Sequence, residues 1–475
     1  MADFEVDLLA IERGSIVAPA GCGKTHHIAE ALVRHEAAKP ILILTHTNAG
    51  VVALRSRLDK ASVPSRSYRL ATIDGWAMRL ISMFPHRSGH DPAILNLANP
   101  ATDYPAIRIA AANLLKAGHV SDVLQSSFAR LIVDEYQDCN MVQHTLVSFA
   151  AQLLPTVVLG DPMQAIFTFA GKMPDWDAEV CVQFPLACEL ATPWRWRNAG
   201  TEPFGRWLLD VRNRLVSGGV VDLNNAPLEV TWIPLDGTED HQRRLKAART
   251  RAPNIDGSVL IIGNSRNPAA QRDFAGQTPG AVTVENVGME DLVNFARGLN
   301  LASATVLDHV VSFAGSVMIN VGSAQFLQRI DSLQRGTARN DPTDAEASAL
   351  SFAAAPSFRG AVNVLVEIGR QTGVRSHRQH VLQACIKMLR SCEGSDSAAL
   401  YDVAIRVREQ NRLLGRPLPK RAVGSTLLLK GLEAEVAVVL NAPDLDDAKH
   451  LYVAMTRGSH ALVICSPTAI LQRTK

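Results

Sequence analysis

The sequence predicts an α/β protein with two parallel-sheet cores and mainly helical insertions. Short apolar runs alternate with helical patterns over residues 13–160 and again from about residue 228, as is typical of parallel sheets with crossover helices. Inside the second of these regions, residues 299–420 follow a mainly helical pattern. A chain of 475 residues is also too long for one hydrophobic core, so we expect several domains.

Four apolar runs in the first region end in polar or glycine-rich segments. They are "GSIVAPAGCGKT" (14–25), "PILILTHTN" (40–48), "ARLIVDEYQD" (129–138) and "PTVVLGDPMQ" (155–164). The first run is typical of a buried strand, a glycine-rich turn and the start of a helix. Because the carboxyl ends of parallel strands meet at one edge of a sheet, we expect these polar segments to form a ligand site.

The second region repeats this alternation. Strands are expected in "LEVTWIPL" (228–235), "SVLIIGNSRN" (258–267), "STLLLKGLEAEVAVVL" (425–440) and "ALVICS" (461–466). The polar stretch over residues 335–348 predicts a loop within the helical part. This order indicates one α/β unit interrupted by a helical insertion.

Composition excludes several classes of protein. The chain is 47% hydrophobic and 20% charged, and no apolar stretch approaches the ~20 residues that a membrane-spanning helix needs, so we expect no membrane association. The N-terminus is acidic and lacks the pattern of a secretory signal. The seven cysteines are scattered, which argues against a zinc site and favours a cytoplasmic location.

Charge is balanced overall but uneven along the chain. The formal net charge is +2, yet the stretch from Arg370 to Arg421 has eleven Lys and Arg against four Asp and Glu. A concentrated basic face is typical of surfaces that bind phosphate backbones. The alternative is an ordinary solvated helical surface.

The segment "APAGCGKT", from Ala18 to Thr25, fits a phosphate-binding loop with alanine in place of the usual first glycine. Glycines at its turn let backbone N–H groups point inward at a β-phosphate, Lys24 supplies a point charge, and the Thr25 hydroxyl can bind Mg²⁺. The nucleotide-binding residues expected here are Ala20, Gly21, Cys22, Gly23, Lys24 and Thr25. The alternative is a chance glycine-rich turn.

The carboxylates of "LIVDEYQD" supply the complementary chemistry. Asp134 follows an apolar strand and is expected to hold Mg²⁺ together with Thr25. Glu135 is expected to orient and deprotonate an attacking water, because in-line phosphoryl transfer needs a positioned nucleophile. The alternative is a simple turn at a strand end.

These motifs, with others in order, resemble those of the UvrD/Rep/PcrA family of superfamily 1 helicases. "DEYQD" and "GDPMQAIF" are similar to motifs II and III of that family. The other similar segments are "THTNAGVVALRSRL" (motif Ia), "TIDGWAMRLI" (Ib), "LATPWRWRN" (IV), "STLLLKGLEAE" (V) and "LYVAMTRG" (VI). Together with the phosphate loop they span Ala18 to Gly458, nearly the whole chain.

The resemblance implies two RecA-like P-loop cores with ATP and Mg²⁺ in the cleft between them. Gln164 would sense the γ-phosphate, and Glu433 would contact the nucleotide. Arg195 and Arg457 would act as arginine fingers, with Arg197 as an alternative to Arg195.

The resemblance also implies a path for a single DNA strand. Phe167 and Phe169 occupy positions where the family stacks bases, and Trp76 would add a further platform. Packing in the core is the alternative for these rings. The side chains expected to hydrogen-bond phosphates are Thr45, Thr47, Asn48 and Thr72.

We expect a first core over residues 1–198 with a short helical insertion at about 82–127. The second core is expected over residues 199–298 and 421–475, with the basic helical insertion over 299–420. Both insertions are small for the family.

Some positions depart from the family pattern. No glutamine precedes the phosphate loop, so the usual adenine-reading residue is missing. Ser425 and Leu427 replace the threonine and histidine of motif V, and Ala170 replaces the arginine after the second aromatic of motif III. These departures put nucleotide selectivity and coupling to the strand in question.

The leading hypothesis is therefore an ATP-dependent helicase or translocase that moves 3′→5′ on single-stranded DNA and acts at duplex junctions. The first alternative is an ATPase and DNA-sensing subunit of a larger complex, with weak unwinding and a protein partner. In its small size it resembles the UvrD-like subunits of antiphage systems such as Gabija, and a repair complex is equally compatible. A second alternative is a nucleotide-binding structural protein, against which the intact motif residues argue.

Overall fold

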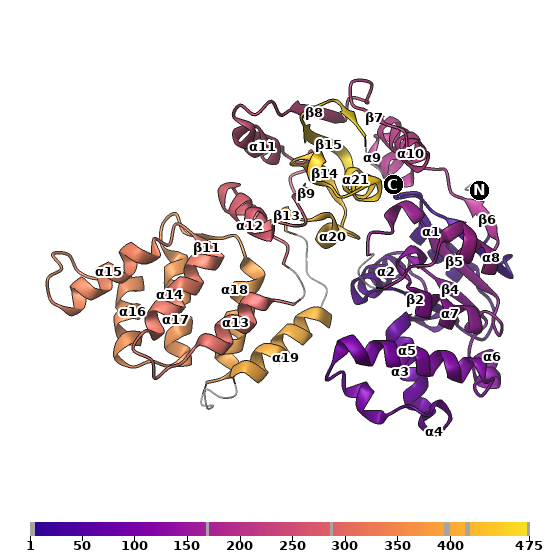
Figure 1. Cartoon of the computed structure of the whole chain (residues 1–475), viewed down its shortest axis with the longest axis horizontal. Coiled ribbons are helices and arrows are strands. Elements are labelled where there is room, and N and C mark those ends of the chain that lie inside the picture. The colour runs from indigo at the N-terminus through magenta and orange to yellow at the C-terminus, as the bar shows by residue number, and fades with distance from the viewer. Residues whose placement is uncertain (1–4, 168–170, 286–287, 394–399, 414–418, 473–475) are drawn as a thin grey trace. The chain divides into compact units, whose positions relative to one another are not determined.

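The computed structural model describes residues 5–167, 171–285, 288–393, 400–413 and 419–472 (Figure 1). By packing, the chain divides into two units. The first comprises Met1–Thr231, Leu445–Ala461 and Thr468–Lys475, and the second comprises Trp232–Asp444 and Leu462–Pro467. The first unit thus extends past residue 198 and includes two C-terminal segments. The domain boundaries indicated by the sequence remain a prediction.

A six-stranded sheet forms the centre of the first unit, in the order β3-β2-β4-β5-β1-β6. Its strands are β1 (Arg13–Val17), β2 (Ile41–Thr45), β3 (Tyr68–Thr72), β4 (Arg130–Val133), β5 (Thr156–Gly160) and β6 (Leu186–Glu189). Every neighbouring pair runs parallel. The carboxyl ends of these strands therefore lie along one edge of the sheet.

Both faces of this sheet are buried. Leu42 and Leu44 of β2 pack into one apolar cluster, and Ile41 and Ile43 pack into another, because successive side chains of a strand point to opposite faces. The helices of the unit are α1 (Lys24–Arg34), α2 (Asn48–Lys60), α3 (Ile73–Met83), α4 (Pro85–Ser88), α5 (Pro100–Lys116), α6 (Ser121–Ser127), α7 (Met141–Ala150), α8 (Cys181–Gln183), α9 (Trp194–Ala199), α10 (Glu202–Val216) and α21 (Ala448–Met455). A short strand β7 (Val221–Asp222) pairs with β16 (Ile470–Leu471).

The second unit contains another six-stranded sheet, in the order β10-β13-β9-β14-β15-β8. Its strands are β8 (Val230–Pro234), β9 (Val259–Ile262), β10 (Val282–Thr283), β13 (Arg421–Gly424), β14 (Ala434–Val439) and β15 (Gly458–Ser466). The pairs that join β10, β13, β9 and β14 are parallel. Helices α11 (Asp240–Ala248), α12 (Pro268–Gln277) and α20 (Thr426–Leu429) accompany this sheet.

A helical body, α13 to α19, is inserted in the second unit and shares one apolar core. Its helices are α13 (Glu290–Gly298), α14 (Val306–Val317), α15 (Ser323–Gln334), α16 (Asp344–Ala354), α17 (Phe358–Arg370), α18 (Gln379–Ser391) and α19 (Leu400–Leu413). A two-residue pairing of β11 (Met318–Ile319) with β12 (Arg375–Ser376) joins two of its connections. The expected fold class, two parallel-sheet α/β cores with helical insertions, is confirmed. Among the described residues no helix is long and apolar enough to span a bilayer.

Candidate nucleotide and strand site

The phosphate loop lies between β1 and α1, and its two turn glycines have left-handed backbones. Gly21 has φ +71° and Gly23 has φ +81°, a region that other residues seldom adopt. Space is a second reason for glycine here. A Cβ on Gly21 would come within 2.5 Å of the Trp196 ring, and one on Gly23 within 2.7 Å of the Trp194 ring. The two tryptophans of α9 therefore pack directly on the loop.

Other parts of the loop are held from a distant helix. The backbone N–H of Ala20 donates to the Tyr452 hydroxyl of α21 at 3.1 Å, which the sequence did not indicate. Cys22 is buried, and burial is the main cause that raises the pKa of its thiol to about 12. Cys22 therefore fills space as a neutral thiol and has no nucleophilic character.

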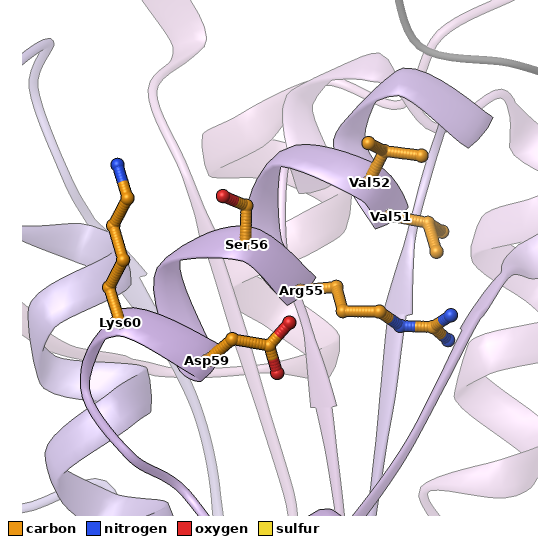
Figure 2. Close-up of a pocket in the computed structure, with 6 residues that line it drawn as sticks. All are labelled: Val51, Val52, Arg55, Ser56, Asp59 and Lys60. Atoms are coloured by element: carbon orange, nitrogen blue, oxygen red, sulfur yellow. The ribbon is translucent and has the colours of Figure 1, made fainter.

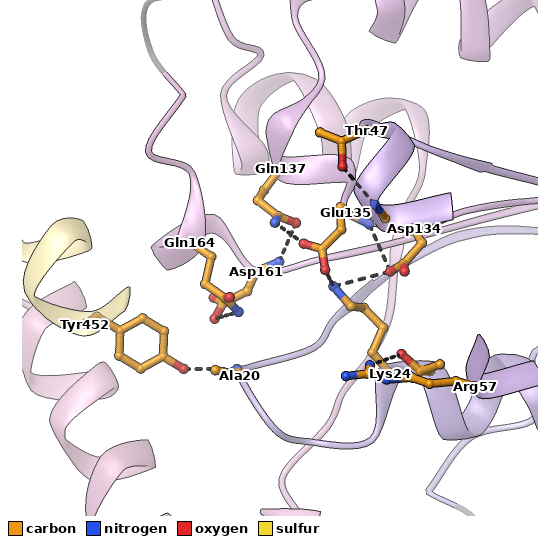
Figure 3. Close-up of polar contacts among 12 residues, drawn as sticks. Ala20, Lys24, Thr47, Arg57, Asp134, Glu135, Gln137, Asp161, Gln164 and Tyr452 are labelled. Atoms are coloured by element: carbon orange, nitrogen blue, oxygen red, sulfur yellow. Dashed lines mark hydrogen bonds and ion pairs between the residues drawn. The ribbon is translucent and has the colours of Figure 1, made fainter. Parts of the chain in front are cut away.

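Lys24 contacts both carboxylates that follow β4 (Figure 3). Its Nζ lies 2.5 Å from Oε1 of Glu135 and 3.2 Å from Oδ1 of Asp134. Burial alone would lower the pKa of Lys24, but the two carboxylates outweigh it and raise that pKa above its ordinary value. Burial also raises the pKa of Asp134, against the opposing charge of Lys24. The expected loop lysine and carboxylates are thus brought together.

Glu135 has a left-handed backbone, φ 56°, which is uncommon for a residue other than glycine. Its side chain is held from two sides, because Oε1 faces Lys24 and Oε2 accepts from Gln137 Nε2 at 2.6 Å. Gln137 in turn accepts from the Asp161 backbone N–H at 3.1 Å, and Gln164 Nε2 donates to Asp161 Oδ2 at 3.1 Å. Glu135 and Gln164 are therefore linked through two side chains (Figure 3).

Thr25 is the second residue of α1, after Lys24, and its Oγ1 accepts from Arg57 Nη1 of α2 at 2.9 Å. The Thr25 hydroxyl and the Asp134 carboxylate are the hard oxygen donors that Mg²⁺ prefers, and the amino end of α1 carries no acidic residue in its first turn. These residues fit a magnesium–nucleotide complex. The sequence did not single out Arg57, although it lies within motif Ia, on the helix α2.

Arg195 and Arg457 meet at Thr456. Arg195 Nη1 donates to the Thr456 carbonyl at 2.6 Å, and the Arg195 backbone N–H donates to the Gly21 carbonyl at 3.0 Å. Arg457 is buried, and its Nη2 donates to Thr456 Oγ1 at 3.0 Å. The two expected arginine fingers thus lie together near the phosphate loop, within the first unit.

Two further aromatic residues lie beside the loop. The rings of His26 and Trp194 have centroids 6.1 Å apart, and the Arg197 guanidinium lies 5.2 Å from the Trp194 ring. Arg197 also pairs with Glu202 at 3.0 Å. The guanidinium of Arg197, the alternative arginine finger, therefore contacts the indole ring of Trp194 and the carboxylate of Glu202.

Glu433 lies in the second unit, exposed, between α20 and β14. Its assignment to the nucleotide remains a prediction.

Two of the three threonines expected to contact the DNA strand, Thr47 and Thr72, lie at helix starts. The Thr47 hydroxyl caps α2 by accepting from the Gly50 N–H at 3.0 Å, and the Thr72 hydroxyl caps α3 by accepting from the Gly75 N–H at 2.9 Å. Both hydroxyls therefore have a structural role that accounts for their residue type. Asn48, the first residue of α2, is exposed, whereas Thr45 at the end of β2 is buried.

The aromatic candidates differ in environment. The Phe167 ring is partly exposed and stacks on His46, with centroids 6.1 Å apart and an interplanar angle of 24°. Phe169 lies outside the described residues, as does Ala170. Trp76 is only 6% exposed and packs in the apolar cluster beneath α3. Its environment matches core packing, the alternative that the sequence left open.

A surface hollow of about 490 Å³ lies along α2 (Figure 2). Its lining residues are Val51, Val52, Arg55, Ser56, Asp59 and Lys60. They follow the Thr47 cap on the same helix, and none belongs to the phosphate loop.

Several arginines of the basic stretch from Arg370 to Arg421 make internal contacts, so this stretch presents less positive charge at the surface than its composition indicated. Arg378 is buried against Glu285 and Asp291. Arg375 donates to four main-chain carbonyls at the end of α12, and Arg421 donates to two carbonyls after α11. These three arginines stabilise the fold through internal contacts. They therefore do not contribute to a phosphate-binding surface.

Comparison with known families gives one match, to the UvrD/REP helicase N-terminal domain over residues 95–175. A search of curated proteins finds no match. Among solved structures, the Pif1 helicase from Candida albicans aligns over 98% of this chain and 95% of its own, at 10% identity and a TM-score of 0.39. That similarity is too low to support an argument.

The family match covers the carboxylate motif and the whole "GDPMQ" motif, including Asp134, Glu135 and Asp161, which follow β4 and β5. The phosphate loop precedes it, and the arginines of motifs IV and VI lie beside that loop. Over residues 95–175, which include the strands that lead to the two carboxylates and to Asp161, the chain is therefore similar to the N-terminal domain of UvrD/REP helicases.

Proposed function

We propose that the chain hydrolyses ATP, with Mg²⁺, to move 3′→5′ along single-stranded DNA and to open duplex DNA at junctions. The observation that carries this proposal is the contact of Lys24 with both Asp134 and Glu135 at the carboxyl edge of the sheet. DNA as the strand and the 3′→5′ direction rest on the resemblance to UvrD-type helicases.

The residues divide the work of phosphoryl transfer. A bound magnesium–nucleotide complex supplies the phosphoanhydride bond that is cleaved. Lys24 exchanges its carboxylate partners for phosphate oxygens, which leaves Glu135 able to accept a proton from water. Gln137 keeps hold of the other Glu135 oxygen, so the carboxylate stays oriented. Thr25 and Asp134 would hold the metal ion through their side-chain oxygens.

Charge that develops on the transferred group needs cations. Arg195 and Arg457 supply two guanidinium groups whose positions are fixed by Thr456. Fingers of this kind are worth roughly 10³–10⁵ in rate where they act. Phe167, beside His46, offers an aromatic surface for a base.

The test is ATP hydrolysis by the purified chain with no nucleic acid, with single-stranded DNA, with duplex DNA and with RNA. The proposal expects strong activation by single-stranded DNA and displacement of a strand from a duplex that carries a 3′ tail. A chain that hydrolyses no ATP under any of these conditions would overturn the proposal. Displacement from a 5′-tailed duplex alone would overturn the direction.

A second candidate is an ATPase subunit that senses DNA for a partner protein and unwinds weakly by itself. One observation favours it. Arg375, Arg378 and Arg421 bind carbonyl and carboxylate groups of the second unit, which reduces the basic surface of that unit. Hydrolysis that responds to single-stranded DNA without displacement of either tailed duplex would support this candidate.

A further inference from the structure

Asp161 is a fully buried carboxylate, 0% exposed, directly after β5. Its Oδ1 accepts from Met163 N at 3.1 Å and from Arg212 Nε at 3.0 Å, and its Oδ2 accepts from Gln164 Nε2 at 3.1 Å. A carboxylate removed from water is stable only when charged or polar donors replace its hydration. These donors therefore replace the water that the buried Asp161 carboxylate would otherwise bind.

Arg212, on α10, supplies the positive charge. Its side chain is 6% exposed, and Nη1 donates to Glu189 Oε1 at 2.8 Å. Burial alone would lower the pKa of Arg212, but Asp161 and other neighbours raise it above the ordinary value. The guanidinium is thus a fixed cation held between the buried Asp161 and the half-exposed Glu189.

Asp161 determines how Gln164 is turned. An ionised carboxylate only accepts hydrogen bonds, so the amide group of Gln164 must present its NH₂ end to Asp161. The carbonyl end of the amide then faces away from Asp161. Only a charged carboxylate in this place fixes the Gln164 amide, because a neutral carboxyl group can donate as well as accept. If Asp161 shifted away, its hydrogen bond to Gln164 would be lost as well.

We propose that Arg212 is a positioning residue for ATP hydrolysis, which fixes Asp161 and through it the orientation of Gln164. The inference rests on the proposed function and on the role of γ-phosphate sensor that the family resemblance implies for Gln164. Arg212 lies in no helicase motif identified in the sequence, and it acts on the reaction only through other side chains.

The experiment compares Arg212→Met with two controls in the full chain. Glu189→Gln weakens the exposed contact of the same guanidinium and leaves Asp161 untouched. Arg206→Met removes an arginine of the same helix that pairs with Glu202 on the surface. Thermal melting checks folding, a fluorescent ATP analogue gives the nucleotide Kd, and steady-state hydrolysis with saturating single-stranded DNA gives kcat.

Arg212→Met is expected to lower kcat by roughly 10–100-fold, as is typical when a partner that orients a site residue is lost, with little change in nucleotide Kd. Both controls should stay close to wild type. In a Gln164→Ala background the same substitution should have little further effect on kcat, because the residue that Arg212 positions is already gone.

A loss of kcat that is equally large with and without Gln164, or one that is matched by loss of nucleotide binding, would show a merely structural role and overturn the inference. So would a folded Arg212→Met variant with wild-type kcat. If Arg212→Met does not fold, Arg212→Lys decides by the same comparison, since it keeps the charge but loses the planar geometry of the guanidinium.

The two proposals fail in different ways. Wild-type chain without ATPase activity on any nucleic acid ends the proposed function and this inference with it. An active wild type with an equally active, folded Arg212 variant ends this inference alone.

Discussion

Arg378 and Glu285 form a buried bidentate ion pair, with Nε 2.6 Å from Oε1 and Nη2 2.9 Å from Oε2. Arg378 directly precedes α18, and Glu285 follows β10. The ion pair therefore links the helical body to the strands of the same unit. Nη2 also lies 2.5 Å from Oδ2 of Asp291 on α13. One guanidinium thus joins the start of α18 to two carboxylates that lie 93 and 87 residues earlier in the chain.

We predict that Arg378→Met destabilises the chain by about 3–5 kcal/mol, because it leaves Glu285 buried without its counter-charge. Arg370→Met is the matched control. Arg370 pairs with Glu367 at 2.5 Å, but its side chain is 70% exposed, and such pairs contribute about 0–1 kcal/mol. Urea denaturation followed by circular dichroism measures both. Equal losses for the two variants would contradict the assignment.

Lys24→Ala and Glu135→Gln should both abolish hydrolysis but differ in nucleotide binding. Lys24 is the cation for the phosphates, so its removal should weaken ATP binding by an order of magnitude or more. Glu135→Gln removes a proton acceptor and keeps the shape, so ATP should bind at least as well as in wild type. Equilibrium binding of a fluorescent ATP analogue and steady-state hydrolysis separate the two effects. Near wild-type turnover in Glu135→Gln would remove Glu135 from the base role.

Activation by single-stranded DNA should depend on Phe167. Replacing Phe167 with Ala is expected to raise the DNA concentration for half-maximal ATPase activity by roughly 5–100-fold, which corresponds to ~1–3 kcal/mol of lost stacking. Basal hydrolysis without DNA should change little. His46→Ala tests the neighbouring ring.

DNA affinity should also fall steeply with salt, since strand binding releases counterions.

Acid should destabilise the second unit through His377. Burial, Arg378 and Arg375 lower the pKa of His377 to about 4, against the opposing charges of Glu285 and Asp273. The unfolded chain therefore takes up a proton before the folded chain does. Stability is unaffected above about pH 6.5, falls as the pH drops from 6.5 to 4, and loses at most about 3 kcal/mol over that range.

The measurement is urea denaturation at pH 7.5 and at pH 5. His377→Gln cannot take up the proton and should lose less stability between these two pH values than wild type does. His35→Gln, at a partly exposed position of the first unit, should behave like wild type. The same pH loss in His377→Gln as in wild type would contradict the assignment.

The clustering of Lys24, Asp134 and Glu135 could be predicted from sequence because each part of it is local. Lys24, Asp134 and Glu135 each follow a short apolar strand, and parallel pairing brings such strand ends to one edge without further information. The contacts of Tyr452 with Ala20 and of Arg212 with Asp161 join residues 432 and 51 positions apart. No local pattern marks such pairs, so only the folded chain reveals them.

The basic stretch and Trp76 show a second limit of sequence reasoning. A count of arginines gives charge but not placement. Arg378 is buried, and Arg375, although partly exposed, donates to main-chain carbonyls. Trp76 follows the Thr72 cap by four residues, which places it on the face of α3 that packs on the sheet. The position of Trp76 on the helix therefore could have indicated that it packs in the core. Nothing in the local sequence distinguished Arg375 and Arg378 from arginines on the surface.

Because Lys24 already faces two carboxyl groups, the resting site exerts little net attraction on a bare nucleotide anion. Long-range electrostatic steering toward the loop must therefore come from elsewhere, chiefly the positive end of the α1 dipole and whatever cation travels with the nucleotide. A triphosphate already paired with its divalent ion meets less repulsion from Asp134 and Glu135 than a free one does. The resting ion pair thus acts as a kinetic filter on which ionic form of the nucleotide enters.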